Sequence, residues 1–189
     1  MRIGVIGTAG RKDDAIRMSQ ELYDKMYGVL LSDLSHWTGA EITLVSGGAA
    51  WADHLAVRAY LDKVVPHLEL HFPAAFRSSK FVESSFQMCP GRIANWYHQK
   101  MAHKTNVNSL IQIQRAIDLG ATYTVSSGFF QRNHLVGNVD ILIAFTFGTR
   151  DSQGTNLTAE QAGLKDGGTA HTWDHSDASF KIHHDLTRL

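Results

Sequence analysis

The sequence predicts an α/β fold built on a doubly wound, mainly parallel sheet that is flanked by helices. Short apolar runs at residues 2–7, 41–46 and 67–72 alternate with longer segments of helical periodicity. A βαβαβ succession of this kind needs right-handed crossovers and favours a parallel sheet. Glycine-rich turns follow several of the runs. With 189 residues the chain is long enough to bury the core of a single domain over residues 1–189.

Each element follows from its pattern, with apolar runs bounded by Gly, Pro or Asp indicating strands and 3.6-residue periodicity indicating helices. The expected strands are residues 2–7, 41–46, 67–72, 121–125, 140–147 and 180–184. The expected helices are one long helix from 13 to about 37–39, then 51–61, 91–103, 105–119, 129–136, one or two turns within 158–164, and a last helix that starts at 166–169. In the long first helix, Asp13 and Asp14 lie favourably in the first turn.

Two segments interrupt this alternation. Residues 74–106, after the third strand, have weak periodicity but many aromatic side chains, which argue against disorder, so we interpret them as an ordered insertion with one short helix. Thr105 is expected to cap the helix that follows. Residues 148–165 form a polar excursion before the last helix.

Composition excludes several classes of protein. Lys plus Arg equals Asp plus Glu at 18 each, so no net field attracts the chain to DNA or to an anionic membrane. No apolar run reaches the roughly 20 residues that cross a bilayer, so no membrane partner is expected. The single cysteine, Cys89, has no internal disulfide partner, and the N-terminus lacks the pattern of a signal peptide. A cytoplasmic protein is expected.

The glycine turns predict a binding site. In an open parallel sheet, ligands bind outside the carboxyl ends of the strands, where the strand order reverses. Glycine turns occur at residues 4–10, 44–53 and 166–172, and we expect the three to converge on one phosphate-bearing small molecule. The spacing of the first turn is not G-x-G-x-x-G, and the chain has no G-x-x-x-x-G-K-[ST], so neither a dinucleotide fingerprint nor a P-loop is present.

Four motifs together carry a family resemblance. They are Val5-Ile-Gly7-Thr-Ala-Gly-Arg11, Val45-Ser-Gly-Gly-Ala-Ala-Trp-Ala-Asp53, Arg132-Asn133 before the strand at 140–144, and Gly167-Gly-Thr169. In this order they resemble the SLOG superfamily, which includes the DNA-processing protein A, the LOG phosphoribohydrolases and small stand-alone nucleotide-binding proteins. The resemblance covers most of the chain outside residues 74–106 and 148–165. It implies a Rossmann-like fold.

The resemblance also implies a pocket for a nucleotide or a nucleotide-derived ligand. Its expected ligand-binding residues are Gly7, Thr8, Arg11, Ser46, Gly47, Gly48, Asp53, Arg132, Asn133, Gly167, Gly168 and Thr169. For Asp53 a structural role near a helix start is an equal alternative. Arg132 and Asn133 either reach the ligand or pair with Asp140. No further cofactor is expected.

Catalysis is less clearly indicated than binding. The LOG hydrolases resemble Pro-Gly-Gly-x-Gly-Thr-x-x-Glu at the last turn, where the glutamate assists cleavage of the N-glycosidic bond. This chain has Asp166-Gly-Gly-Thr-Ala-His-Thr-Trp-Asp174 instead, so Asp174, or Glu83 in the insertion, is the only candidate for that carboxylate. The motif therefore favours recognition over catalysis, and if the protein is an enzyme we expect a hydrolase of N-glycosidic bonds in nucleotides.

Three further possibilities concern a metal ion, nucleic-acid bases and an oligomer. His171 and His175 share a helix face at metal-ligand spacing, but a chain with 11 histidines has such pairs by chance, so no metal is predicted. The insertion interleaves basic and aromatic residues that could stack bases, although the neutral chain favours an insertion that packs on itself. Its basic residues are Arg77, Lys80, Arg92, Lys100 and Lys104. Homo-oligomers are common in the superfamily, but no interface pattern indicates one here.

These observations give three ordered hypotheses. The first is a protein that binds a nucleotide-type ligand as sensor, carrier or enzyme. The second is a nucleoside 5′-monophosphate N-glycosidase of the LOG type. The third is a protein that binds single-stranded DNA and resembles the DNA-processing protein A.

Overall fold

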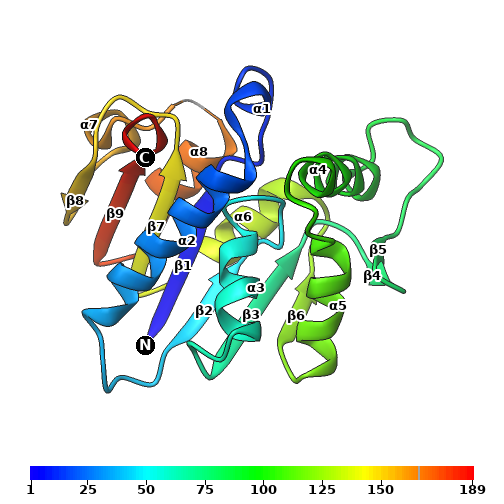
Figure 1. Cartoon of the computed structure of the whole chain (residues 1–189), viewed down its shortest axis with the longest axis horizontal. Helices are drawn as coiled ribbons and strands as arrows, with labels where there is room; N and C mark the ends of the chain where they lie inside the picture. Colours follow the sequence, from blue (N-terminus) through cyan, green and yellow to red (C-terminus); the bar gives the residue numbers. More distant parts are fainter. Residues whose placement is uncertain (166) are drawn as a thin grey trace.

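A computed structural model describes residues 1–165 and 167–189 and shows a sheet of seven strands flanked by helices on both faces (Figure 1). Its strands are β1 (Arg2–Gly7), β2 (Thr43–Ser46), β3 (His67–Phe72), β6 (Thr122–Val125), β7 (Ile141–Thr146), β8 (Ser152–Gly154) and β9 (Phe180–Asp185). A separate hairpin joins β4 (Phe76–Arg77) to β5 (Lys80–Phe81). The helices are α1 (Asp14–Arg17), α2 (Gln20–Ser35), α3 (His54–Leu61), α4 (Pro90–Thr105), α5 (Ser109–Asp118), α6 (Phe129–Gly137), α7 (Ala159–Ala162) and α8 (Gly168–Asp174), and a 3₁₀ turn, η1 (Leu186–Arg188), ends the chain.

The strand order is β6-β3-β2-β1-β7-β9-β8, and every neighbouring pair is parallel except β8 with β9. The chain moves outward from β1 through β2 and β3 to β6, then returns to place β7 on the other side of β1. The order therefore reverses between β1 and β7. This is the place at which ligands bind in open parallel sheets. The mainly parallel sheet expected from the sequence is confirmed, and it is consistent with a Rossmann-like fold.

Alternating residues of the central strands supply two separate cores. In β1, Ile3 and Val5 belong to the core beneath α2, α3 and α5, whereas Ile6 faces the core beneath α6, α7 and α8. The same alternation separates Leu44 from Val45 in β2. Figure 1 shows α2, α3 and α5 in front of the sheet and α6 and α8 behind it. A strand covered on both faces reads as a continuous apolar run, which is why the sequence revealed these strands.

The single long helix expected from residue 13 to about residue 37 is wrong, because the chain forms two helices there. Helix α1 ends at Arg17, and Met18 has an extended backbone. Ser19 then caps α2, since its side chain accepts a hydrogen bond from the N–H of Leu22 at 3.1 Å. Ile16, which continued the apolar pattern, is 85% exposed. Ile16 matches the apolar periodicity without facing the core. The start of α2 is set by its cap, Ser19.

The segment 74–106 is ordered, but its helix is longer than expected. It holds the hairpin β4-β5 and the 16 residues of α4. Thr105 is the last residue of α4 and not the cap of the next helix; the cap of α5 is Asn108, whose side chain accepts from the N–H of Ile111. That this segment is an insertion stays a prediction.

The last part of the chain completes the sheet. Residues 148–165 contain the short strand β8, which the sequence did not predict, and helix α7, which lies within the expected 158–164. Strand β9 confirms the expected last strand. Asp166, the expected start of the last helix, lies outside the described residues, and α8 begins at Gly168. Within the described residues, no helix combines the length and apolar character needed to cross a membrane.

The cap of α2 gives a first test. Replacing Ser19 by Ala removes the acceptor for the Leu22 N–H and should lower the free energy of unfolding by about 1 kcal/mol. Urea denaturation at pH 7 measures the change. Ser32→Ala on the exposed face of α2 is the matched control and should cost nothing, because Ala is the better helix former there. Equal effects of the two substitutions would contradict the assigned cap.

Candidate functional site

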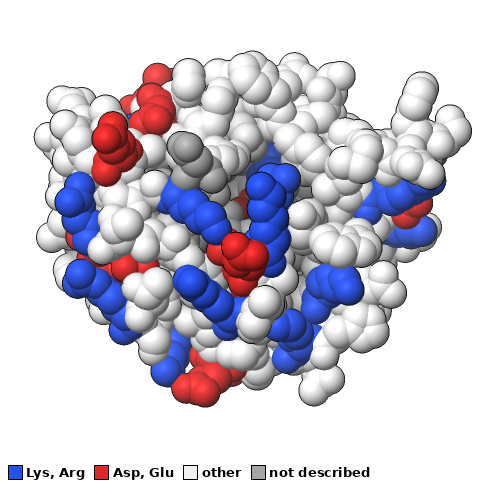
Figure 2. Space-filling view, turned by 90° about the horizontal axis from the view of Figure 1, so that it is seen from above, with Lys and Arg blue, Asp and Glu red and all other residues white. Residues whose placement is uncertain are grey.

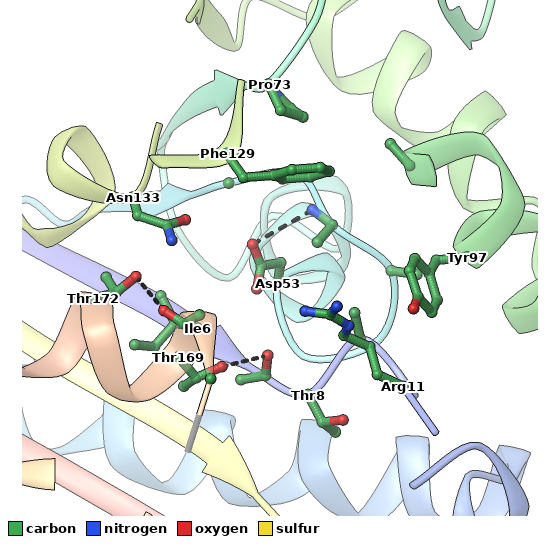
Figure 3. Close-up of a pocket in the computed structure, with 18 of the residues that line it drawn as sticks. Ile6, Thr8, Arg11, Asp53, Pro73, Tyr97, Phe129, Asn133, Thr169 and Thr172 are labelled. Atoms are coloured by element: carbon green, nitrogen blue, oxygen red, sulfur yellow. Dashed lines mark hydrogen bonds between the residues drawn. The ribbon is translucent and has the colours of Figure 1, made fainter. Parts of the chain in front are cut away.

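A cavity of about 510 Å³ lies at the carboxyl ends of β3, β2, β1 and β7. Its floor is made by the segments that follow these strands and by α8, and its walls come from α4 and α6. Figure 3 shows Phe129 and Pro73 at one end, Thr8 and Thr169 at the other, and Asp53 between them. The cavity therefore spans the point at which the strand order reverses.

This cavity collects nearly all of the residues predicted to bind the ligand. Those that line it are Gly7, Thr8, Arg11, Gly47, Gly48, Asp53, Arg132, Asn133, Gly167, Gly168 and Thr169. Ser46 lies beneath it, fully buried, where its hydroxyl donates to the carbonyl of Asp53 at 2.8 Å and accepts from the N–H of Gly48 at 3.1 Å. Ser46 thus shapes the turn after β2 from below.

The turn after β2 needs glycine at two positions. Gly48 has a φ of 63°, and a Cβ there would lie 2.6 Å from the ring of Phe72. A Cβ on Gly47 would occupy the place of the Arg132 guanidinium. The carbonyl of Gly48 accepts a hydrogen bond from His98 Nε2 at 3.0 Å, and His98 Nδ1 lies 2.8 Å from the hydroxyl of Ser109. Burial lowers the pKa of His98 to about 4, so the ring is neutral and fixes this turn to α4 and α5.

A buried ion pair crosses the middle of the cavity. Arg132 Nη1 of α6 lies 3.1 Å from Asp53 Oδ2, and both side chains are almost inaccessible to solvent. Asp53 also accepts from the N–H of Ala49 at 3.4 Å. Burial raises the pKa of Asp53, and the Arg132 guanidinium and the backbone N–H groups oppose that shift. The expected alternative, pairing with Asp140, is wrong, because Asp140 instead accepts from the backbone N–H of Arg2.

The turn after β1 is held by a second carboxylate. Thr8 donates its hydroxyl proton to Asp14 Oδ2 at 2.8 Å, and Lys165 Nζ lies 3.1 Å from Asp14 Oδ1. Across the same end, Thr169 of α8 donates to the carbonyl of Gly7 at 2.9 Å. These contacts join the loop after β1 to the segment around α8.

Two helices add an apolar wall that the sequence did not reveal. Phe129 and Val136 line the cavity from α6, and Ile93, Ala94 and Tyr97 do so from α4. Both sets of residues have helical spacing, so the sequence does indicate that each lies on one face of a helix. Helical spacing alone, however, does not tell a stripe that faces the core from one that faces a cavity.

The cavity carries a net positive formal charge. Among the described lining residues, the cations are Arg11, Lys12, Arg132 and Lys165, and the carboxylates are Asp14 and Asp53. Asp53 pairs with Arg132 and Asp14 with Lys165, whereas Arg11 and Lys12 form no ion pair with any residue that the structure describes. Figure 2 looks down on this face and shows Lys and Arg side chains near its centre, with acidic side chains among them. In Figure 3, Arg11 is directed into the cavity.

The two carboxylates proposed for catalysis lie elsewhere. Asp174 accepts a hydrogen bond from the N–H of Ala159 at 2.6 Å, which ties α8 to α7. Glu83 forms ion pairs of 3.2 Å with both Lys80 and Arg92, outside the cavity. Neither residue lines the cavity, so neither is placed to act on a ligand bound there.

The histidine pair on α8 forms a surface stack. The rings of His171 and His175 are parallel, with centroids 4.2 Å apart, and His134 of α6 lies against both. Within the described part of the chain, no group of three or more His, Cys, Asp or Glu side chains is arranged to hold a metal ion.

Fold and cavity together define an α/β protein with a mostly parallel sheet and a basic pocket at its carboxyl edge. No protein-family model matches the chain, and no solved structure matches it. The uncharacterized protein R261 of Acanthamoeba polyphaga mimivirus is 37% identical to it over 161 residues, which are 82% of this chain and 87% of R261. The chain belongs to the same protein family as R261. Because that relative is uncharacterized, the relationship establishes kinship and not activity.

The neutral His98 makes stability depend on pH. Its pKa in the folded protein, about 4, is below the ordinary 6.5, so the unfolded chain binds the proton more tightly. The stabilisation is complete above about pH 6.5 and is lost as the pH falls towards 4. Between pH 7 and pH 5 the wild type should lose about 2 kcal/mol more than His98→Gln, which cannot titrate. Urea denaturation at both pH values measures this, and equal losses would contradict a buried neutral ring.

The buried pair gives a second test of the site. Arg132→Met leaves the carboxylate of Asp53 buried without its cation and should lower the free energy of unfolding by about 3 kcal/mol at pH 7. Adding Asp53→Asn to that variant removes the stranded charge and should restore part of the loss. Guanidinium denaturation of the wild type and of the single and double variants measures the coupling. If the two substitutions were simply additive, the pair would contribute nothing.

Proposed function

We propose that this protein binds a nucleotide or a nucleotide-derived phosphate ligand in the cavity at the carboxyl edge of its sheet. The observation that carries the proposal is the combination, in one cavity at the point of strand reversal, of an aromatic wall and cations that form no ion pair with any described residue. Its volume of about 510 Å³ suits a small molecule. The motifs that resemble the SLOG superfamily lie on the turns after β1 and β2, on α6 and at the start of α8, all of which line it.

The two ends of the cavity suit the two ends of such a ligand. Phe129 and Pro73, at the end opposite Thr8 and Thr169, offer flat apolar surfaces against which a base packs. Arg11 and Lys12, together with Lys165, offer positive charge for a phosphate. Arg132 also lines the cavity, where its guanidinium is held by Asp53.

Binding without hydrolysis is the form of the proposal that the side chains favour. Cleavage of an N-glycosidic bond needs a carboxylate at the anomeric carbon. The carboxylates that line the described part of the cavity, Asp14 and Asp53, are each engaged by a cation. A LOG-type glycosidase therefore remains the second hypothesis, and release of free base would be its signature.

The proposal is tested with a panel of nucleoside 5′-monophosphates. At a concentration near 100 times the dissociation constant, a ligand should stabilise the wild type by about 2.7 kcal/mol, which corresponds to a rise of roughly 5–10 °C in Tm. Chromatography of the same mixtures detects any free base. Single-stranded DNA that binds and is released by salt, with no response to any nucleotide, would overturn the proposal in favour of the third hypothesis.

Two substitutions separate the two ends of the ligand. Arg11→Gln should weaken binding of every phosphate ligand about 10-fold, because a charge-assisted hydrogen bond is lost. Arg115→Gln, on an exposed face of α5 away from the cavity, removes the same charge and should change nothing. Phe129→Leu should weaken nucleotides but not ribose 5-phosphate, which has no base. Calorimetric titration measures all three, and equal effects of the two arginine substitutions would show that the phosphate lies elsewhere.

A further inference from the structure

Four threonines line the cavity, and each has already given its hydroxyl proton to the protein. Thr8 donates to Asp14 Oδ2 at 2.8 Å, Thr169 to the carbonyl of Gly7 at 2.9 Å and Thr172 to the carbonyl of Gly168 at 2.9 Å. Thr146, at the end of β7, lies 2.7 Å from His183 Nε2. A threonine hydroxyl has one proton and two lone pairs, so these oxygens have only lone pairs left for a ligand.

The direction of the Thr146 hydrogen bond follows from the contacts of His183. His183 is fully buried in β9, and its Nδ1 lies 2.9 Å from the carbonyl oxygen of Ala162. A carbonyl only accepts, so Nδ1 carries a proton and donates it. Burial lowers the pKa of His183, so at neutral pH the ring has no second proton. Nε2 must then accept, and Thr146 must donate inward.

The hydrogen bond from Thr146 to His183 is costly to break. If the hydroxyl of Thr146 turned to donate to a ligand, His183 Nε2 would lose its partner in a site without access to solvent. The acceptor character of Thr146 is therefore fixed by a side chain that the ligand does not touch. We call the four residues Thr8, Thr146, Thr169 and Thr172 the threonine floor.

A phosphate dianion does not suit the threonine floor, because it too offers only acceptors. The groups of a nucleotide that donate are its sugar hydroxyls and the N–H groups of its base, and the base belongs at the opposite, aromatic end. The sugar hydroxyls are therefore the donors that remain for the threonine floor.

We propose that the threonine floor accepts hydrogen bonds from the sugar hydroxyls of the ligand, so that the protein selects ribonucleotides over deoxyribonucleotides. This inference rests on the proposed nucleotide binding and specifies the sugar. It places the phosphate above the floor, towards Arg11, Lys12 and Lys165 at the mouth of the cavity. Thr146 is the specificity-determining residue, and His183 is its positioning residue.

The test compares each ribonucleoside 5′-monophosphate that binds with its 2′-deoxy and 3′-deoxy counterparts. The wild type should bind the ribonucleotide about 10-fold more tightly than at least one deoxy form. Thr146→Val keeps the shape but removes the oxygen, and it should bring that ratio towards one by weakening only the ribonucleotide. Thr146→Ser keeps the hydroxyl and should keep the ratio. Calorimetric titration gives each ratio within one protein, so a reduced folded fraction does not alter it.

The outcomes separate this inference from the function on which it rests. Equal binding of the ribose and deoxyribose forms by the wild type, or an unchanged ratio in Thr146→Val, overturns the threonine floor and leaves nucleotide binding intact. No binding of any nucleotide by the wild type overturns both. If Thr146→Val does not fold, the ratio measured with the wild type and with Thr169→Val decides in its place.

Discussion

The cavity depends on the buried ion pair between Asp53 and Arg132. Asp53 belongs to the turn after β2, and Arg132 belongs to α6, which returns the chain across the sheet towards β7. The pair therefore joins the turn after β2 to the helix that leads to β7, on the other side of β1. Removing two charges from water is costly, and here the cost is offset by their short contact and by a backbone N–H bond from Ala49 to the carboxylate. Residue 47 must be glycine, because a side chain there would collide with the guanidinium of Arg132.

Other contacts converge on the same turn from below and from the side. Ser46 holds the backbone of Asp53 and Gly48 from beneath, and His98 holds the carbonyl of Gly48 from α4. Because these contacts come from the protein itself, they hold the turn without a ligand. Such preorganisation lowers the entropy that binding has to overcome.

The sequence predicted the parts of the structure that depend on local pattern. Buried parallel strands are apolar on both faces, and their ends are marked by glycine turns, so the sheet and the turns that line the cavity could be recognised. It failed where one side chain overrides periodicity, as Ser19 does by starting α2 after the exposed Ile16. It missed Phe129 and Tyr97 because a stripe on a helix looks the same whether it faces a core or a cavity.

The contacts of the threonine floor could not be read from the sequence at all. Thr146 and His183 are 37 residues apart and meet only because β7 pairs with β9 in the register that sets Ala144 opposite His183. The direction of the hydrogen bond of Thr146 depends on the proton on His183 Nδ1, which is donated to the carbonyl of Ala162. Ala162 belongs to α7, which lies between β7 and β9 in the sequence. Hydrogen-bond polarity at a binding site is thus a property of the assembled fold. In this protein it divides the cavity into a basic mouth and a floor of hydroxyl groups that accept, and the ligand that we propose would meet the two with its phosphate and its sugar hydroxyls.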